Sequence, residues 1–187
     1  MSPLPAFRVP PSDGVVRLRE WRMSDVPEMA LACRDPEIAR WTMVPDDYTE
    51  ADARGFVAGR EDARGCGESL DAAVVDAGSG ALLGAVALTS VDWRHERGEV
   101  GYWVARWARG RGVAVRAVRL LSAWTFEHTD LGRLDLMTYV GNVASERVAE
   151  RAGFTREGVL RAYYLAKRGR RDVTMFGLVR PGPPAAP

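Results

Sequence analysis

An arginine- and glycine-rich turn gives the clearest chemical signal in the sequence. The turn consists of Arg109, Gly110, Arg111 and Gly112. It lies between an apolar run and a helical pattern of apolar residues that starts near Val113. Because glycine tolerates positive φ and lets a ligand approach the backbone, the free N–H groups at the start of that helix can face an anion. The two arginines add charge-assisted donors. This arginine–glycine turn (residues 109–112) therefore favours a diphosphate held at a helix N-terminus.

Two other interpretations of the turn stay open at this point. A strand–helix connection can need glycine for its backbone alone, and short glycine patterns also match by chance. A basic strip that binds nucleic acid is the weaker alternative, because a net charge of +1 provides no excess of positive charge for such binding. The Lys-Ser/Thr pair of a nucleotide-hydrolysis loop does not follow the glycines.

The composition indicates one globular domain without a metal site or a membrane segment. A chain of 187 residues with 47% hydrophobic and 27% charged residues is long enough for one substantial core. Cys33, Cys66 and two isolated histidines offer neither a disulfide framework nor zinc-like spacing. No apolar run reaches the roughly 18 residues of a membrane span. The proline-rich start lacks a signal pattern, so we expect a cytoplasmic protein.

The elements that would position the turn can be predicted from periodicity and from capping residues. Apolar runs predict strands at residues 15–21, two within 68–93 around a Gly-Ser-Gly turn, 98–105, 133–140, 154–166 and 171–179. Helical spacing predicts helices over residues 24–33, 35–41, 50–64, 112–126 and 142–153. We expect Ser24, Thr49 and Asn142 as N-caps and Gly153 just past a helix end.

This order of elements predicts the fold class. One strand is followed by helices, three strands, a helix, a strand, a helix and two strands. Such an order indicates a single mixed α/β (α+β) domain, with a mostly antiparallel central sheet and helices on both faces. We expect residues 1–13 to be a flexible arm, residues 14–180 to form the domain, and residues 181–187 to be a disordered tail.

Two motifs resemble signatures of the GNAT N-acetyltransferase superfamily. Arg109, Gly112 and Ala114 fill the defined positions of its coenzyme A signature, Q/R-x-x-G-x-G/A, between GYWV and a helix. The segment NVASERVAERAGFTREGVLR (142–161) resembles the second signature of the RimJ/RimL branch. RLREWRMSD and WTMVPDDYTEADARGFV near the start are similar to that branch as well. The resemblance covers most of the chain, residues 14–180, and the family has the element order derived above.

The resemblance implies acetyl-CoA as cosubstrate and a set of residues that would hold it. The arginine–glycine turn would surround the pyrophosphate, and strands 98–105 and 133–140 would splay apart to admit the pantetheine arm. Asn142 would contact the coenzyme, although an N-cap role alone also explains an asparagine there. No metal is implied. The implied cofactor-binding residues are Trp103, Val104, Arg109, Gly110, Arg111, Gly112, Val113, Ala114 and Asn142.

Two residues are candidates for proton transfer during acetylation of an amine. Glu99 shares one strand face with Gly101 and Trp103, and the family places its base or an ordered water on this strand. The alternative is a solvent-facing strand glutamate. In the RimJ/RimL pattern, Ser145 would lie near the leaving thiolate as proton donor, although serine is also common at a helix start. Many relatives use a tyrosine of this helix, which has none here.

Trp41, Tyr48 and Trp93 are candidates for the acceptor pocket, with a core position as the alternative for each aromatic. The resemblance implies that the acceptor is a primary amine, and the branch favours the α-amino group of a protein or peptide. A small amine such as an antibiotic or polyamine, and a non-catalytic acyl-CoA-binding module, remain alternatives. We expect no nucleic-acid or membrane partner, and the sequence leaves a homodimer open.

Overall fold

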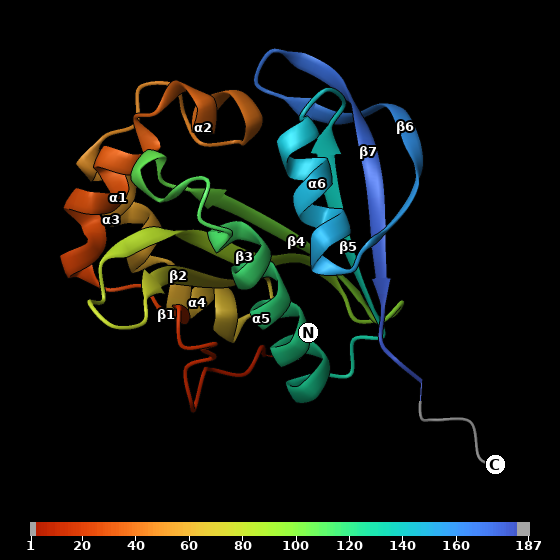
Figure 1. Ribbon diagram of the computed structural model, residues 1–187, viewed down its shortest axis with the longest axis horizontal. Coiled ribbons are helices and arrows are strands. Elements are labelled where there is room, and N and C mark those ends of the chain that lie inside the picture. Colours follow the sequence, from red (N-terminus) through yellow and green to blue (C-terminus); the bar gives the residue numbers. More distant parts are fainter. Residues whose placement is uncertain (1–2, 183–187) are drawn as a thin grey trace.

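The computed structural model describes residues 3–182 and has one sheet with helices on both faces (Figure 1). The strands are β1 (Val16–Glu20), β2 (Leu70–Asp76), β3 (Leu82–Asp92), β4 (Arg97–Val104), β5 (Arg133–Tyr139), β6 (Thr155–Ala166) and β7 (Gly169–Val179). The α-helices are α1 (Val26–Cys33), α2 (Pro36–Trp41), α3 (Glu50–Ala58), α4 (Arg60–Gly65), α5 (Val113–His128) and α6 (Val143–Ala152). Short 3-10 turns lie at Met23–Asp25 and Arg106–Ala108.

The sheet separates in its middle, between β4 and β5. Its strand order is β1-β2-β3-β4-β5-β7-β6, and all neighbours are antiparallel except β4 and β5. The parallel pair is short, and its rungs are Arg97–Arg133, Gly98–Leu134 and Glu99–Asp135. Beyond that rung the two strands diverge toward their C-terminal ends (Figure 1). The predicted fold class, including the splayed strand pair, is confirmed.

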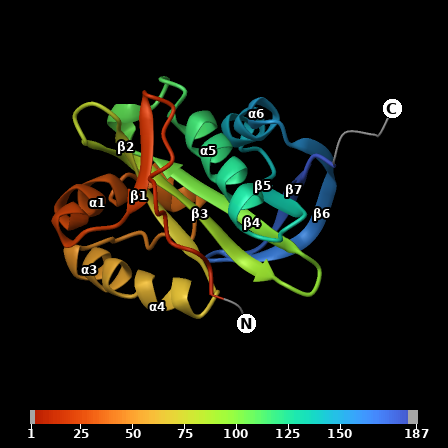
Figure 2. The same ribbon diagram turned by 90° about the horizontal axis from the view of Figure 1, so that it is seen from below.

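Two apolar cores hold the two helical layers on the sheet. Val113, Ala117 and Leu121 of α5 are buried against one face together with Val100 and Leu136. On the other face, α1 and α3 enclose a second core, which includes Val75. Figure 2 shows α5 and α6 on one side of the sheet and α3 and α4 on the other. No helix within residues 3–182 is long and apolar enough to cross a bilayer, and no group of His, Cys, Asp or Glu there could hold a metal ion.

Part of the arm expected over residues 1–13 packs on the domain through Leu4 and Phe7, while residues 8–10 are exposed and residues 1 and 2 lie outside the described part of the chain. Leu4 is 1% exposed, and its N–H donates to the carbonyl of Arg64 at 3.1 Å. Phe7 packs edge-on against Trp124 with ring centroids 4.8 Å apart. The prolines suggested a loose chain, but the isolated apolar residues between them find partners far away in sequence. Of the predicted tail, residues 183–187 lie outside the described part of the chain.

Two details of the predicted helices are corrected. Ser24 is no N-cap, because it lies inside a 3-10 turn, and Asp25 occupies the cap position of α1 while pairing with Arg19 at 2.7 Å. The helix predicted over residues 50–64 is two helices that meet at Gly59, a residue that weakens helix interiors. Thr49 is confirmed as the cap of α3, with its hydroxyl accepting from Asp52 N–H at 3.2 Å.

Candidate active site

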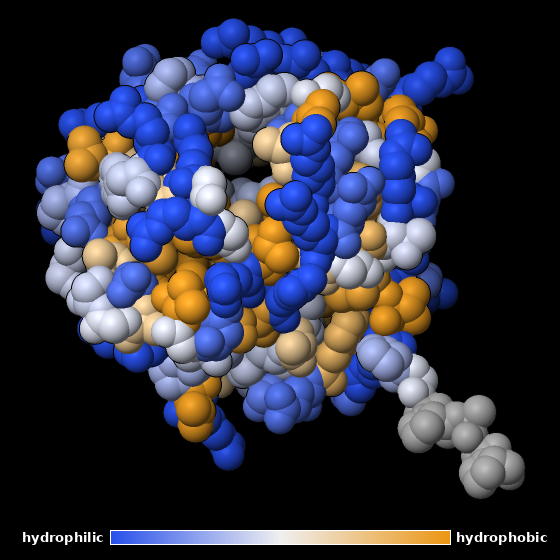
Figure 3. Space-filling view, viewed as in Figure 1, coloured by the Kyte–Doolittle hydropathy of each residue, from blue (hydrophilic) through white to orange (hydrophobic). Residues whose placement is uncertain are grey.

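A cleft of about 840 Å³ opens where β4 and β5 separate. Its walls come from α2 and the loop after it, from the turn before α5, and from β4, β5, α6 and β6. Figure 3 shows this hollow between the surface over α2 and the surface over α6, with hydrophobic groups along its floor and a hydrophilic rim. The volume is within the range of pockets that enclose a small molecule or cofactor.

The arginine–glycine turn forms one end of the cleft and leaves the N-terminus of α5 open. Gly110 and Gly112 both have φ of +74°, the left-handed region that other residues rarely adopt. No side chain caps the 16-residue helix α5, and its first turn holds no acidic residue. The amides of Val113 and Ala114 therefore add to the positive end of the helix dipole at the cleft. This arrangement suits a phosphate or diphosphate group.

Both arginines of the turn pair with carboxylates from other elements. Arg109 lies 2.7 Å from Asp35, the N-cap residue of α2, and its Nε donates to the Val104 carbonyl at 3.3 Å. Arg111 lies 3.9 Å from Asp76. The contact with Asp35 joins the turn to α2, which forms another wall of the cleft. Since Arg109 already occupies the Val104 carbonyl, the predicted contact of Val104 with a ligand falls to its N–H.

Glu99 lies at the last rung between β4 and β5 and lines the cleft. It also borders an adjoining cavity of about 550 Å³. Burial raises the pKa of its carboxyl, and the negative charge of Asp135 raises it further, whereas the side chain of Ser90 lowers it. A carboxyl group with a raised pKa in a cleft is suited to accept a proton from an amine. Its role as the base remains a prediction.

Ser145 meets a tyrosine that the sequence analysis did not single out. Its hydroxyl oxygen lies 2.8 Å from that of Tyr102 on β4, and both residues line the cleft. Burial raises the pKa of Tyr102 to about 12, so its hydroxyl keeps its proton at neutral pH. Asn142 caps α6 by accepting from the Ser145 N–H at 3.2 Å, as predicted. The cap uses only the carbonyl oxygen of Asn142, and its NH₂ group remains a donor at the cleft.

Glu99 and Ser145 lie on opposite faces of β4. Because side chains alternate along a strand, Glu99 and Trp103 face one side and Tyr102 faces the other. Tyr102 reaches Ser145 of α6, whereas Trp103 stacks on Trp21 with centroids 6.4 Å apart. A ligand in the gap between β4 and β5 would thus have a carboxyl group on one side and a pair of hydroxyls on the other.

Two of the three aromatic residues predicted for the acceptor pocket line the cleft. Trp41 is partly exposed at the end of α2 and donates to Glu37 at 3.1 Å. Tyr48 is only 6% exposed and packs in the core under α1 and α3. Trp93 does not line the cleft but packs against the core on the α5 side. The reason is its place in the β3–β4 turn, at the opposite end of β4 from the arginine–glycine turn.

Further cleft residues come from β5, β6 and the loop after α2. Tyr139 donates its hydroxyl to the sulfur of Met43 at 3.7 Å and packs edge-on against Tyr164, with ring centroids 6.0 Å apart. All three line the cleft. Strand alternation in GYWV could have indicated Tyr102, whereas the meeting of these three depends on contacts between the loop after α2, β5 and β6.

The only lysine of the chain ties two walls of the cleft together. Lys167, in the β6–β7 turn, donates to the carbonyls of Ala39 at 2.7 Å and Val44 at 2.6 Å and to the carboxylate of Asp46 at 2.9 Å. A compact ammonium with three donors suits three converging acceptors better than a planar guanidinium. The contact joins the β6–β7 hairpin to α2 and the loop that follows it.

Comparison with known proteins identifies the family. A family model described as an acetyltransferase (GNAT) domain matches residues 16–155. YdaF of Bacillus subtilis is 33% identical over 101 residues, 54% of this chain and 55% of YdaF, so the chain spans about half the length of that relative. The uncharacterized N-acetyltransferase p20 of Bacillus licheniformis is 25% identical over 163 residues, 87% of this chain and 92% of p20. The ribosomal-protein-serine acetyltransferase of Escherichia coli is 26% identical over 98 residues, 52% of this chain and 55% of that protein.

Solved structures share the fold over nearly the whole chain. RimL, a ribosomal L7/L12 α-N-protein acetyltransferase in complex with coenzyme A, has a TM-score of 0.81 at 21% identity, covering 91% of this chain and 97% of RimL. The microcin C7 self-immunity acetyltransferase MccE, in complex with acetyl-CoA and AMP, has a TM-score of 0.82 at 19% identity, covering 90% of this chain and 94% of MccE. The chain therefore belongs to the acetyltransferase (GNAT) family.

Proposed function

We propose that this protein transfers the acetyl group of acetyl-CoA to the α-amino group of a protein or peptide. The observation that carries the proposal is the open N-terminus of α5 behind the arginine–glycine turn, at one end of a cleft that also contains Glu99 and Ser145. The pyrophosphate would occupy the turn. The pantetheine arm would follow the edge of β4 that β5 leaves free, with the backbone of Val104 as a partner, because the backbone groups of Trp103 face Ala85 of β3.

The reaction needs a neutral amine, and a base for the proton that its nitrogen loses on attack. The acceptor ammonium ion loses one proton to solvent before it reacts, and the Glu99 carboxylate accepts the next proton from the attacking amine. The amine nitrogen attacks the thioester carbonyl carbon, and a backbone N–H of β4 polarises the carbonyl oxygen. The carbon–sulfur bond breaks, the amide forms, and Glu99 later releases its proton to solvent. Such general base catalysis contributes typically ~100- to 10,000-fold.

The leaving thiolate would take its proton on the other face of β4. Ser145 and Tyr102 form a hydroxyl pair there, with oxygens 2.8 Å apart. We assign the donation to Ser145, which takes a proton back from Tyr102, and Tyr102 in turn recovers through solvent the second proton that the amine nitrogen loses. The products are the acetylated amine, free coenzyme A and one proton, so charge and atoms balance.

The preference for an α-amine rests on proton energetics and on the relatives. A free α-amine has a pKa near ~7.7–8 and a lysine side chain near ~10.4. Neutralising lysine therefore costs roughly 2.5 units more, or ~3.5 kcal/mol. A single glutamate base is therefore better suited to an α-amine, which costs less free energy to deprotonate than a lysine side chain. RimL is named as an α-N-protein acetyltransferase of L7/L12, and the Escherichia coli relative as acting on a ribosomal-protein serine.

An acceptor panel read by release of free thiol tests the proposal. Acetyl-CoA and longer acyl-CoA esters are each combined with free-N-terminus peptides, matched N-blocked lysine peptides, polyamines and aminoglycosides. We expect acetyl-CoA and free-N-terminus peptides to give the highest kcat/KM, rising with pH and levelling near ~8 as the amine deprotonates. Turnover of small amines with no peptide accepted would replace the proposal by a small-molecule acetyltransferase. Tight binding of acetyl-CoA without any turnover would replace it by a binding module.

A further inference from the structure

The last rung between β4 and β5 brings two carboxyl groups together. Glu99 pairs with Asp135 in the register, so their side chains leave the sheet on the same face. Both residues border the cavity of about 550 Å³ beside the main cleft. Past this rung the strands separate, which leaves the pair at the edge of the gap.

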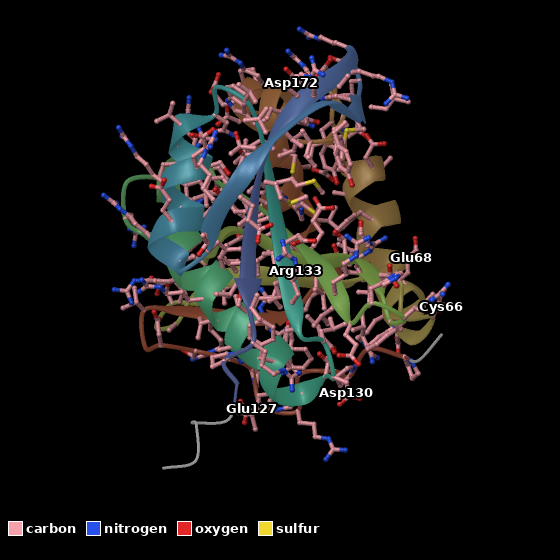
Figure 4. All side chains as sticks on the ribbon, turned by 90° about the vertical axis from the view of Figure 1, so that its right-hand side faces the viewer. Cys66, Glu68, Glu127, Asp130, Arg133 and Asp172 are labelled. Atoms are coloured by element: carbon pink, nitrogen blue, oxygen red, sulfur yellow. The ribbon has the colours of Figure 1, made fainter. Side chains whose placement is uncertain are left out.

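The two carboxyl groups have different partners. Asp135 is 6% exposed and accepts from Arg133 Nε at 2.7 Å, with Arg97 at 3.8 Å. Arg133 is itself anchored to Glu157 by bonds of 2.8 and 2.6 Å. Figure 4, seen from the β6–β7 side, shows Arg133 near the middle of the sheet. By contrast, Glu99 forms no ion pair with any residue between 3 and 182.

A bulge in β3 supplies the third member of the cluster. The register between β3 and β4 shifts between Thr89 and Asp92, and Ser90 has φ of +50° there. A non-glycine residue in this region is strained, and bulges often redirect a side chain next to an active site. The side chain of Ser90 lies near the Glu99 carboxyl and lowers its pKa. Adjacent strands thus contribute Ser90, Glu99 and Asp135 to one cluster.

We propose that Asp135 is a positioning residue for the acetyl transfer: its fixed negative charge makes Glu99 the member of the pair that takes the proton from the acceptor amine. This inference rests on the proposed function of Glu99 as the base. Two carboxylates in contact resist being ionised together, so one of them accepts a proton more readily. Asp135 is paired with Arg133 and Arg97, whereas Glu99 has no arginine partner in the described part of the chain, so Glu99 is left as the proton carrier.

The groups around Glu99 agree with this division of roles. Those that face it are Asp92 from β3, Arg97 from β4, Arg133, Asp135 and Tyr139 from β5, and Tyr163 and Tyr164 from β6. Burial raises the pKa of Tyr139 and of Tyr164, so both are neutral where the enzyme works. Burial and then Asp135 raise the pKa of Glu99.

A carboxyl titration of the wild-type protein tests the proposal without any acceptor. Glutamate and aspartate are labelled with ¹³C at the carboxyl carbon, and the resonances are assigned by their loss in Glu99→Gln and Asp135→Asn. We expect Glu99 to titrate while Asp135 stays ionised over the same pH range. Titration of Asp135 in place of Glu99, or of both together, would overturn the proposal.

The variant Asp135→Asn gives the second test, with Glu157→Gln as its matched control. Asparagine keeps the shape and removes the charge, so we expect Glu99 to titrate at lower pH and kcat on the plateau to fall several-fold, with acetyl-CoA affinity unchanged. Glu157→Gln also loosens Arg133 but leaves the charge of Asp135, and should not move the Glu99 midpoint downward.

The outcomes distinguish a failure of the role of Asp135 from a failure of the proposed function. A fall in kcat with an unmoved Glu99 midpoint would make Asp135 merely structural and overturn the inference. If Asp135→Asn does not fold, the wild-type titration decides, with the Asp135 resonance assigned by correlation of its carboxyl carbon with the backbone. A protein that acetylates only small amines would contradict the proposed acceptor, whereas the acceptor-free titration would still support or overturn the role of Asp135.

Discussion

The hydroxyl oxygens of Tyr102 and Ser145 lie 2.8 Å apart and join β4 to α6 on the wall of the cleft. Tyr102 is on the opposite face of β4 from Glu99, so the two proton-transfer sites are separated by the strand itself. A thioester held between β4 and β5 would have the amine on one side and the hydroxyl pair beside its sulfur.

Removing either hydroxyl should slow turnover without weakening acetyl-CoA binding. We expect Ser145→Ala to lower kcat by about 100-fold or more, the lower end for a lost proton donor. Tyr102→Phe should lower kcat less, and the double variant little further, because groups that act as a unit are not additive. The measurement is kcat with calorimetric Kd for each variant. Independent, multiplicative losses in the double variant would contradict a shared proton path.

A side chain at Gly112 should abolish acetyl-CoA binding. Gly112 has φ of +74° at the start of α5, where valine would strain the backbone by about 1–3 kcal/mol and obstruct the approach of a phosphate. Gly14→Val is the matched control, since Gly14 also has positive φ, +85°, and a Cβ added there would meet no atom within 4 Å, yet it lies outside the cleft. Calorimetry should detect binding only in the control, and equal affinity in both variants would reject the pyrophosphate assignment.

Loss of Lys167 should affect the acceptor more than the coenzyme. Lys167→Met removes the ammonium that bonds Ala39, Val44 and Asp46, so the hairpin and the loop after α2 should separate. We expect KM for the acceptor to rise several-fold, with Kd for acetyl-CoA unchanged. Arg168→Met is the control, because Arg168 is 79% exposed and approaches Asp46 only at 3.5 Å. The same KM in both variants would show that Lys167 does not shape the acceptor site.

Glu99→Gln should stabilise the fold at neutral pH while it lowers turnover. Burial and Asp135 hold the pKa of Glu99 above its unfolded value. The stability that a protonated Glu99 contributes is complete below the unfolded pKa and is lost as pH rises through the folded pKa. Glutamine stays uncharged and avoids that loss. The Tm of the variant should exceed wild type near pH ~8 and match it near pH ~4; an equal difference at both would contradict the raised pKa.

Local signals in the sequence were sufficient for the elements that build the end of the cleft at the arginine–glycine turn. Glycines with positive φ, the periodicity of α5 and the cap at Asn142 all act within a few residues, so each can be predicted from its neighbours. The family motifs then indicate that the strand before the arginine–glycine turn, β4, and the strand after α5, β5, lie next to each other. The splay between β4 and β5 was expected on that ground alone.

What the sequence could not predict depends on contacts between distant segments. Leu4 is buried because it meets Arg64 and the core, and no local pattern indicates that. Trp93 was predicted to line the acceptor pocket because it is aromatic, but it lies in the β3–β4 turn and packs against the core. The pairing of Glu99 with Asp135, and the three bonds of Lys167, require the strand register and the twist of the last hairpin.

The most direct test of the proposed function is the position of the acetyl group on a peptide that carries both a free N-terminus and an internal lysine. The peptide competes with itself for one enzyme, so acceptor concentration and affinity for the rest of the chain cancel. After incubation with acetyl-CoA at about pH 7.5, near the α-amine pKa, fragmentation mass spectrometry locates the acetyl group. We predict acetylation of the α-nitrogen with the lysine left free, and loss of the product in Glu99→Gln. Acetylation of the lysine side chain, with the α-amine untouched, would contradict the proposed function.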